Sequence, residues 1–193
     1  MKKVTLIGDS IRLGYEGAVR TELEGCAEVW APEGNGMHSV NHLFFLSWYL
    51  EQPADLIHFN FGGWDCRRLG ASRSDNAVPL EQFARNLDFI LSTVRANTRA
   101  ILIWATITPV IEARYNGRQS RPFDPRRVAS DHERYNETAL PILEKHGVAL
   151  NDLHAFVTRE GAEKLIDADG IHYTAEGYRL LGKKVADEIK KLL

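Results

Sequence analysis

The sequence has 193 residues, with a hydrophobic share of 44% and a charged share of 26%, which is ordinary for a soluble globular domain. Its formal net charge of −2 offers no electrostatic attraction for nucleic acid or an anionic membrane, and no apolar stretch is long enough to span a bilayer. The two cysteines form neither a disulfide framework nor a metal-ligand pair, so no oxidising compartment is required. We expect a single domain over residues 1–193, no nucleic-acid or membrane partner, and a cytoplasmic location as the default.

Short apolar runs alternate with longer amphipathic segments along the chain. In chain order, the expected elements are a strand at 4–7, a helix at about 14–23, a strand at 27–30, a helix at 39–50 with Ser39 as its N-cap, a strand at 56–61, a helix from near Pro79, a strand at 100–107, a helix at about 130–146, a strand at 148–151 and a final helix. The segment at 108–129 is expected to be a long polar loop. No internal repeat or linker divides the chain.

Strands separated by helices of this length imply parallel pairing with right-handed crossovers. The sequence therefore predicts an α/β fold, a three-layer α/β/α sandwich around a five-stranded parallel sheet. In such folds, ligands bind beyond the carboxyl ends of the strands. Unusual polar residues and glycines stand there: Asp9 and Ser10 after the first strand, Gly34 to Gly36 after the second, and the stretch 60–65 after the third. We expect the functional site at this edge of the sheet.

Ser10 is the candidate nucleophile of that site. It follows the first strand directly and precedes a helix, so we expect its hydroxyl at a strand-to-helix turn, near the positive end of the helix dipole. The competing interpretation is a simple helix N-cap. A serine hydroxyl attacks a carbonyl well only when a base removes its proton, so the nucleophile hypothesis requires a histidine.

His172, in the stretch DADGIHYTAEGY, is the candidate base. Asp169 lies three residues before it on a loop ahead of the last helix, and this spacing lets the carboxylate accept the Nδ1–H and leave Nε2 to face a serine. Three other interpretations stay open. The acidic residues of the loop resemble calcium ligands, although Gly170 is misplaced for an EF-hand loop. His172 could cap the final helix, and Asp152 with His154 forms a rival pair after the fifth strand.

Four blocks in this order resemble those of the SGNH (GDSL-type) hydrolase family: GDS after the first strand, a glycine loop after the second, a Gly-rich element ending in Asp after the third, and DGIH before the last helix. The blocks cover nearly the whole chain. The resemblance implies a flavodoxin-like α/β/α fold and hydrolysis of acyl esters without a metal or other cofactor. It also implies that Ser10 is the nucleophile, His172 the base and Asp169 the residue that orients the base.

The third block departs from the family's pattern. The family usually has Gly-x-Asn-Asp, whose Asn side chain donates to the oxyanion, but this chain has Gly-Gly-Trp-Asp with Trp64 at the Asn position. Asn60 lies two residues before the glycines, and we expect its amide to take the donor role; a purely structural amide is the alternative. The resemblance also implies backbone N–H donors from Ser10 and from a glycine of the second block, for which we choose Gly36 over Gly34.

Four residues near these blocks are candidate contacts of the substrate: Asp9, Asn35, Trp64 and Asp65. Trp64 is equally compatible with core packing. For Asp65, bracing of its loop through backbone N–H groups is favoured over a part in the chemistry. The segment at 108–129 leaves the fourth strand beside the expected site and carries several arginines and aromatics. A lid or recognition flap is one hypothesis for it, and an ordinary solvated loop is the other.

The combined hypothesis is a serine esterase that acts on a small-molecule ester, with short acyl groups, acetyl above all, on a carbohydrate or similar polar alcohol. No long apolar segment indicates a lipid-binding cap, while aromatic and basic loops surround the expected site. The alternatives are a lysophospholipase or thioesterase, an acyltransferase with the same triad, and a catalytically silent binding module. The sequence leaves the oligomeric state open, a homo-oligomer included.

Overall fold

A parallel sheet forms the centre of the computed structural model, which describes residues 1–69 and 75–193. Within those residues the sheet has five strands in the order β2-β1-β3-β6-β7. The strands are Lys2–Gly8 (β1), Ala27–Trp30 (β2), Leu56–Asn60 (β3), Ile101–Ala105 (β6) and Ala149–Asn151 (β7). Every neighbouring pair is parallel, so the carboxyl ends of these strands lie at one edge of the sheet.

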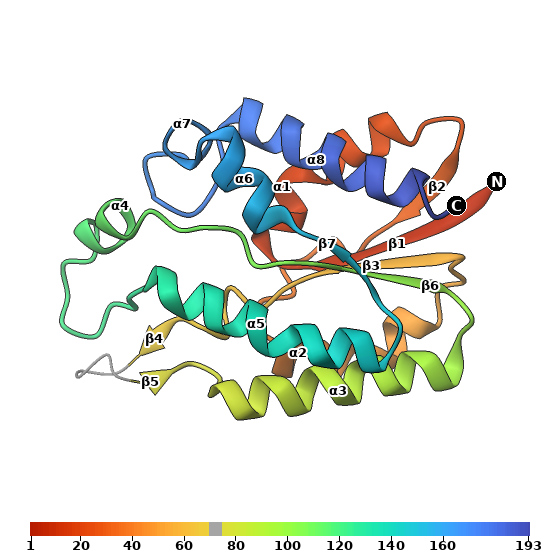
Figure 1. Ribbon diagram of the computed structural model, residues 1–193, viewed down its shortest axis with the longest axis horizontal. Coiled ribbons are helices and arrows are strands. Elements are labelled where there is room, and N and C mark those ends of the chain that lie inside the picture. Colours follow the sequence, from red (N-terminus) through yellow and green to blue (C-terminus); the bar gives the residue numbers. More distant parts are fainter. Residues whose placement is uncertain (70–74) are drawn as a thin grey trace.

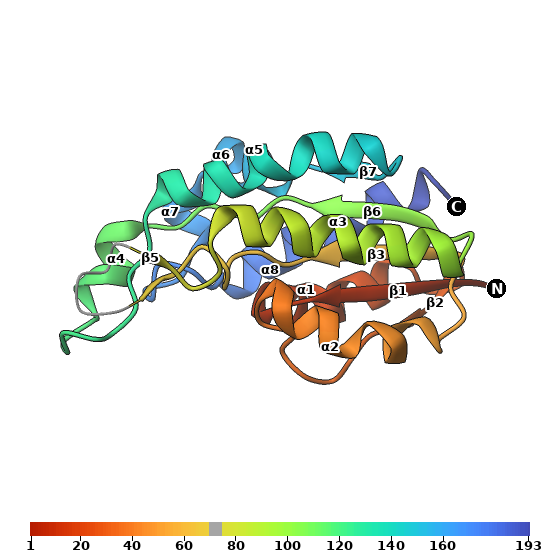
Figure 2. The ribbon, with the colours of Figure 1, turned by 90° about the horizontal axis from the view of Figure 1, so that it is seen from below.

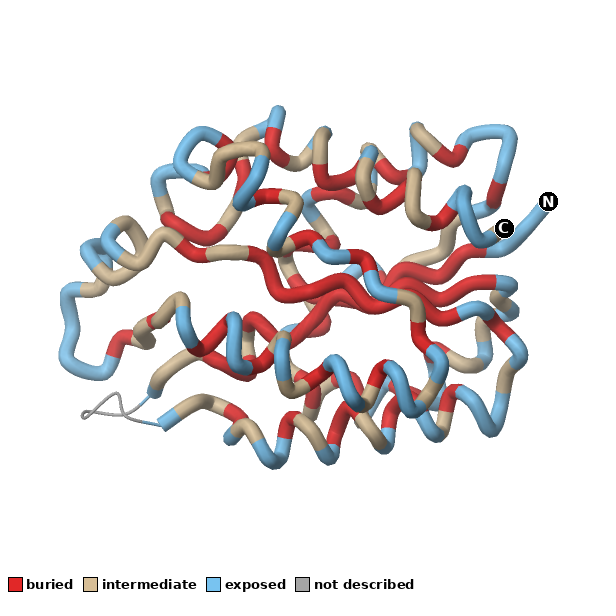
Figure 3. The backbone as a smooth tube through the Cα atoms, viewed as in Figure 1, coloured by how far each residue is buried: buried red, intermediate tan, exposed pale blue. Residues whose placement is uncertain are grey.

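Helices cover both faces of this sheet (Figures 1 and 2). One face packs against α1 (Ser10–Glu22), α6 (Leu153–Glu160) and α8 (Ala175–Lys190), and the other against α2 (Ser39–Leu50), α3 (Leu80–Asn97) and α5 (Ala129–Lys145). Side chains alternate along each strand, so Leu6 of β1 joins the first core and Ile7 joins the second. Most residues of the central strands β1, β3 and β6 are buried between the two helical layers (Figure 3). The structure confirms the predicted α/β/α sandwich with a five-stranded parallel sheet.

The N-terminal caps of two helices differ from the prediction. Helix α1 begins at Ser10 instead of near residue 14, since the Asp9 side chain accepts the Ile11 N–H at 2.9 Å and caps the helix there. Helix α2 is capped by His38 and not by Ser39: Nδ1 of His38 accepts the Asn41 N–H at 3.2 Å. Ser39 is instead the first residue of the helix.

Several short elements differ from the prediction. Helix α4 (Glu112–Gly117) lies in the segment predicted to be a loop throughout, and α7 (Ala162–Leu165) follows α6. Strands β4 (Arg68–Leu69) and β5 (Asp75–Asn76) form a small antiparallel pair before α3. These elements are too short for a clear apolar period in the sequence. In the described part of the chain, no helix has the length and apolarity needed to cross a membrane.

Candidate active site

The carboxyl edge of the sheet brings Ser10 and His172 together. Ser10 is the first residue of α1, directly after β1, and His172 lies on the loop between α7 and α8. These distant parts of the sequence meet because α1 and α8 pack side by side on one face of the sheet (Figure 1). The Ser10 hydroxyl donates to the His172 ring, with 3.0 Å between Oγ and Nε2.

Asp169 accepts the other ring N–H of His172, with 2.6 Å between Oδ2 and Nδ1. This bond places the proton on Nδ1 and leaves Nε2 as the acceptor for Ser10. Oδ1 of Asp169 accepts the backbone N–H groups of Ile171 and His172, each at 2.9 Å. Partial burial acts to raise the pKa of Asp169, but the backbone bonds and the imidazole outweigh burial and hold the pKa below its usual value. Asp169 is therefore an anion at neutral pH.

Gly170 shapes the loop that carries this pair. Its φ of +81° lies in the left-handed region, which glycine adopts without steric cost. Its carbonyl oxygen accepts the Ile111 N–H at 2.8 Å, so the loop is tied to the chain that enters α4. A Cβ at this position would lie 2.5 Å from the backbone nitrogen of Tyr115. The glycine of DGIH thus serves the turn that brings Asp169 back to His172.

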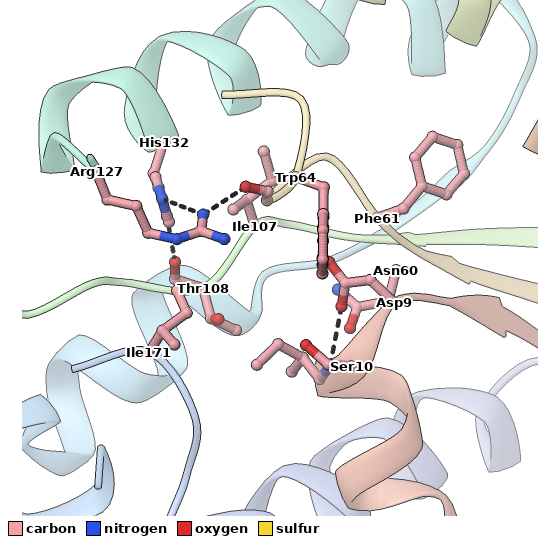
Figure 4. Close-up of a pocket in the computed structure, with 12 residues that line it drawn as sticks. Asp9, Ser10, Asn60, Phe61, Trp64, Ile107, Thr108, Arg127, His132 and Ile171 are labelled. Atoms are coloured by element: carbon pink, nitrogen blue, oxygen red, sulfur yellow. Dashed lines mark hydrogen bonds between the residues drawn. The ribbon is translucent and has the colours of Figure 1, made fainter. Parts of the chain in front are cut away.

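A small cavity of about 20 Å³, with room for about one water molecule, opens beside Ser10. Of the residues predicted for the site, Asp9, Ser10, Asn60 and Trp64 line it. Figure 4 shows Ser10, Asp9 and Asn60 at one end of the cavity and Arg127 at the other. The predicted nucleophile therefore faces a small cavity.

Asn60 ends β3 and is only 3% exposed. Its carbonyl oxygen accepts the Asp9 N–H at 3.1 Å, which ties the end of β3 to the turn that carries Ser10. Within the described residues, Oδ1 of its side chain has no hydrogen-bond partner, although the side chain lines the cavity. Nδ2 of the same amide donates to no group of the described residues, so its N–H groups are available to an acceptor that enters the cavity.

The structure does not bring the glycine loop of the second block into the cavity. The Gly36 N–H donates to the carbonyl oxygen of Gly8 at 3.0 Å, so the predicted oxyanion donor is already occupied and the assignment of Gly36 does not fit this geometry. Asn35 accepts the Met37 N–H through Oδ1 at 2.8 Å. Gly36 and Asn35 instead line a separate groove of about 380 Å³, together with Asn41, Phe45 and Trp48.

The two aspartates predicted to contact substrate have different surroundings. Asp65 is fully buried away from the cavity and accepts the Ser39 N–H at 2.9 Å as well as the Ser39 hydroxyl. It therefore braces α2, and the prediction that it contacts the substrate is wrong. Burial raises the pKa of Asp65 to about 7. Asp9 does line the cavity while it caps α1. Burial raises the pKa of Asp9 to about 6, against the opposing effects of the Ile11 N–H and Arg127.

The sequence prediction does not include two residues of the cavity wall, Arg127 and His132. Nη1 of Arg127 donates to the Gly63 carbonyl oxygen and lies 3.4 Å from Nε2 of His132. The other ring nitrogen of His132 donates to the carbonyl oxygen of Thr108 at 2.8 Å, and burial lowers the pKa of His132 to about 3. The arginine-rich composition of 108–129 was the available signal for Arg127, and nothing in the sequence singles out His132.

The rival pair does not form an Asp–His unit. Asp152 caps α6, where Oδ1 accepts the Ala155 N–H and the Thr106 hydroxyl, each at 3.0 Å. Nδ1 of His154 lies 3.0 Å from the carbonyl oxygen of Ile107 and donates to it. The imidazole is therefore oriented by the backbone and not by Asp152, and neither residue lines the cavity beside Ser10.

Comparison with known proteins agrees with this geometry. The sequence matches the model of the GDSL-like lipase/acylhydrolase family over residues 6–180. No match was found among curated proteins. A lipase/acylhydrolase from Enterococcus faecalis shares the fold with a TM-score of 0.82 and 22% identity, over 100% of this chain and 97% of that one.

Two esterases of known structure are also similar. An acetyl xylan esterase gives a TM-score of 0.73 at 15% identity, over 97% of this chain and 99% of that one. A psychrotrophic esterase from Pseudoalteromonas sp. gives 0.72 at 15% identity, over 100% and 98%. At such identities these structures establish a common fold, while the family match covers most of the sequence. The chain belongs to the GDSL-like lipase/acylhydrolase family and is a carboxylic ester hydrolase.

Proposed function

We propose that this protein hydrolyses short-chain acyl esters, above all acetyl esters, of a carbohydrate or another polar alcohol, with Ser10, His172 and Asp169 as its catalytic triad. The observation that supports the triad most strongly is the unbroken chain of hydrogen bonds from Asp169 through both ring nitrogens of His172 to the Ser10 hydroxyl. Each bond has the direction that proton removal from the serine requires.

In the proposed mechanism Ser10 attacks the ester carbonyl carbon while Nε2 of His172 takes the serine proton. The imidazolium is stabilised by Asp169, then gives its proton to the leaving alcohol. Water, deprotonated by the same imidazole, attacks the acyl carbon. The bond from this carbon to Ser10 Oγ breaks, the imidazolium returns its proton to the serine oxygen, and the acid is released. The His172 side chain is 43% exposed, so water has access to the base for this second step.

The proposed oxyanion donors are the Ser10 backbone N–H and the Asn60 side chain. The Ser10 N–H stands in the first turn of α1, where backbone N–H groups have no acceptor within the helix and the helix dipole is positive. Asn60 lines the same cavity, with its side chain near Ser10 (Figure 4). Removal of one such donor typically costs on the order of 10²–10³ in turnover, so a chain with Trp64 at the usual Asn position needs a substitute.

The size of the cavity supports a short acyl group. The cavity beside Ser10 is small, with a volume of about 20 Å³, so it suits a short acyl group better than a long alkyl chain. The groove that contains Asn35 and Asn41 also presents the rings of Phe45 and Trp48, and such a mixture suits a sugar, which has polar edges and apolar faces. The acetyl xylan esterase with the same fold acts on this class of ester.

A chain-length series tests the proposal. We expect kcat/KM to be highest for 4-nitrophenyl acetate and to fall steeply through the butyrate, octanoate and decanoate esters, because longer chains do not fit the cavity. Ser10→Ala, measured in parallel, gives the uncatalysed background. A preference for the octanoate or decanoate ester would contradict the proposed acyl specificity and favour a lysophospholipase or thioesterase.

A further inference from the structure

We propose that Arg127, assisted by Arg67, forms an anion-binding subsite opposite Ser10, and that the substrate is a short ester carrying a carboxylate group. This inference rests on the proposed esterase function and narrows its substrate class. Two types of ester fit this description, and both place a carboxylate within reach of Arg127. The carboxylate belongs either to the acyl group, as in a half-ester of a short dicarboxylic acid, or to the alcohol, as in an acylated hydroxy acid.

Arg127 is held rigidly in the wall of the cavity. It is 5% exposed, and its Nη1 donates to the Gly63 carbonyl oxygen. Nε2 of His132 lies 3.4 Å from the same nitrogen, and because the His132 Nδ1–H donates to Thr108, Nε2 is left as an acceptor for the guanidinium. One end of the guanidinium is therefore fixed by a carbonyl oxygen and a neutral imidazole.

The other edge of the Arg127 guanidinium has no partner. In the described part of the chain, Nε is buried without a hydrogen bond, Nη2 makes none, and no carboxylate forms an ion pair with Arg127. Figure 4 shows Arg127 at the far end of the cavity from Ser10, with no dashed line from this edge. Two neighbouring N–H groups on one edge match the two oxygens of a carboxylate. Asp9 attracts Arg127 from the same wall, and the centroid of the Tyr115 ring lies 5.1 Å from the guanidinium carbon, but neither group binds this edge, where a carboxylate would add a direct ion pair.

Arg67 adds a second positive charge nearby. Its guanidinium lies over the ring of Trp64, a residue of the cavity wall, at 4.3 Å from the ring centroid. Among the described residues, Arg67 has no ion pair, and its Nε is buried without a partner. Burial and then the charge of Arg127 lower the pKa of Arg67, so the two guanidinium groups are close enough to repel each other. Two like charges held together in this way favour an anionic ligand.

Asp9 is the acidic group of the cavity wall, and it attracts Arg127 without forming an ion pair with it. Its Oδ1 accepts the Ile11 N–H at the start of α1, so its charge is directed to the positive end of that helix. Burial raises the pKa of Asp9 to about 6, with Arg127 acting in the opposite direction. The cavity wall therefore carries the charges of Asp9 and Arg127, and Arg67 adds a second positive charge behind Trp64. The cavity is also small, so an anion that reaches Arg127 must belong to the same short molecule as the ester attacked by Ser10.

The test compares charged and neutral esters of matched shape. The acyl arm uses the 4-nitrophenyl half-ester of succinic acid against its methyl diester, and the alcohol arm uses O-acetyl lactate against O-acetyl lactamide. Rates are corrected with Ser10→Ala, because the succinate half-ester also hydrolyses spontaneously. The readout is the ratio of kcat/KM for the charged ester to kcat/KM for the neutral ester. Loss of the hydrogen bond from Arg127 to Gly63 would lower both values alike and leave this ratio unchanged.

We expect the wild type to prefer the charged ester in one arm by about 10- to 100-fold, the range that a charge-assisted paired hydrogen bond provides. Arg127→Met should bring the ratio close to 1, and Arg127→Lys should keep only part of it because lysine retains the charge without the planar fork. The matched control is Arg118→Met, an exposed arginine of the same segment, which should keep the wild-type ratio. No preference in either arm, or an unchanged ratio in Arg127→Met, overturns the proposal.

A binding measurement separates this inference from the proposed function. Succinate and lactate at millimolar concentration should raise the thermal unfolding temperature of both the wild type and Ser10→Ala, but not that of Arg127→Met. This result would support the anion subsite even if no ester were hydrolysed. Absence of hydrolysis would refute only the proposed esterase function. Equal stabilisation of Arg127→Met and the wild type, or none of any protein, overturns the anion subsite even if neutral esters are hydrolysed.

Discussion

The Ser10 hydroxyl lies 3.0 Å from Nε2 of His172, although 162 positions of sequence separate the two residues. Ser10 opens the first helix and His172 precedes the last one, and both helices pack on the same face of the sheet. The fold thus places the proposed nucleophile against its proposed base. Asp169, on the far side of the ring, completes the arrangement.

Asp169→Asn should lower kcat on 4-nitrophenyl acetate on the order of 10³–10⁴-fold, with a much smaller effect on KM. The amide no longer stabilises the imidazolium that forms when His172 takes the serine proton, and it favours the wrong ring tautomer. Asp167→Asn is the matched control, because Asp167 is an exposed carboxylate on the same loop and binds the Ala168 N–H. A kcat within about 10-fold of the wild type for Asp169→Asn would speak against its orienting role.

Asn60→Ala should lower kcat by on the order of 10²–10³, because the variant lacks one donor to the oxyanion. The effect belongs to the transition state, so KM should change little. Asn97→Ala removes an exposed amide from α3 and serves as the control. Urea unfolding of both variants checks that the loss is not one of folding. If folded Asn60→Ala kept a kcat close to that of the wild type, the amide of Asn60 would be structural.

Gly36→Ala should destabilise the fold by about 1–3 kcal/mol, while Gly34→Ala should change stability by less than about 0.5 kcal/mol. A Cβ at Gly36 would lie 2.2 Å from Cε1 of His42 and 2.7 Å from the Gly8 carbonyl oxygen, whereas a Cβ at Gly34 meets nothing within 4 Å. His42 cannot easily move away, because it is buried and stacked on Phe61 with 4.1 Å between ring centroids. Equal urea midpoints for the two variants would show that the second-block loop is loosely attached.

Asp65 should make stability fall as the pH rises from about 4 to 7. Burial raises the pKa of Asp65 from 3.8 to about 7 in the folded state, so over this range the folded protein holds a proton that the unfolded chain has released. Asp65→Asn cannot titrate, and effects of other groups cancel when the two proteins are compared. The stability of the wild type minus that of the variant should decrease by on the order of 2–4 kcal/mol over this range, measured by urea unfolding. A difference that grows with pH would mean that the bonds from Ser39 outweigh burial.

The fold and the grouping of Ser10, His172 and Asp169 were predictable because strong local patterns encode them. Apolar runs alternating with amphipathic segments predict the parallel sheet, and the polar residues at the strand ends mark its functional edge. Ser10 stands at the end of β1, and the DGIH stretch carries both Asp169 and His172, so their placement needs little beyond the order of the elements.

The remaining parts of the site depend on tertiary contacts that no sequence pattern expresses. Gly36 lies in the expected loop, but its N–H is used by the backbone of Gly8. Asp65 follows the Gly-rich block, but it is turned into the core by Ser39, 26 positions away. Arg127 reaches the cavity because the chain between β6 and α5 folds back over the edge of the sheet, a path that the composition of that segment does not predict.

Labelling with a fluorophosphonate tests the central claim most directly, because only a serine hydroxyl activated by a neighbouring base reacts readily with this reagent. We expect intact-protein and peptide mass spectrometry to find one stoichiometric adduct on Ser10, none on Ser10→Ala, and strongly slowed labelling of His172→Ala. An unlabelled wild type with a normal unfolding transition, or an adduct that persists in Ser10→Ala, would contradict the account.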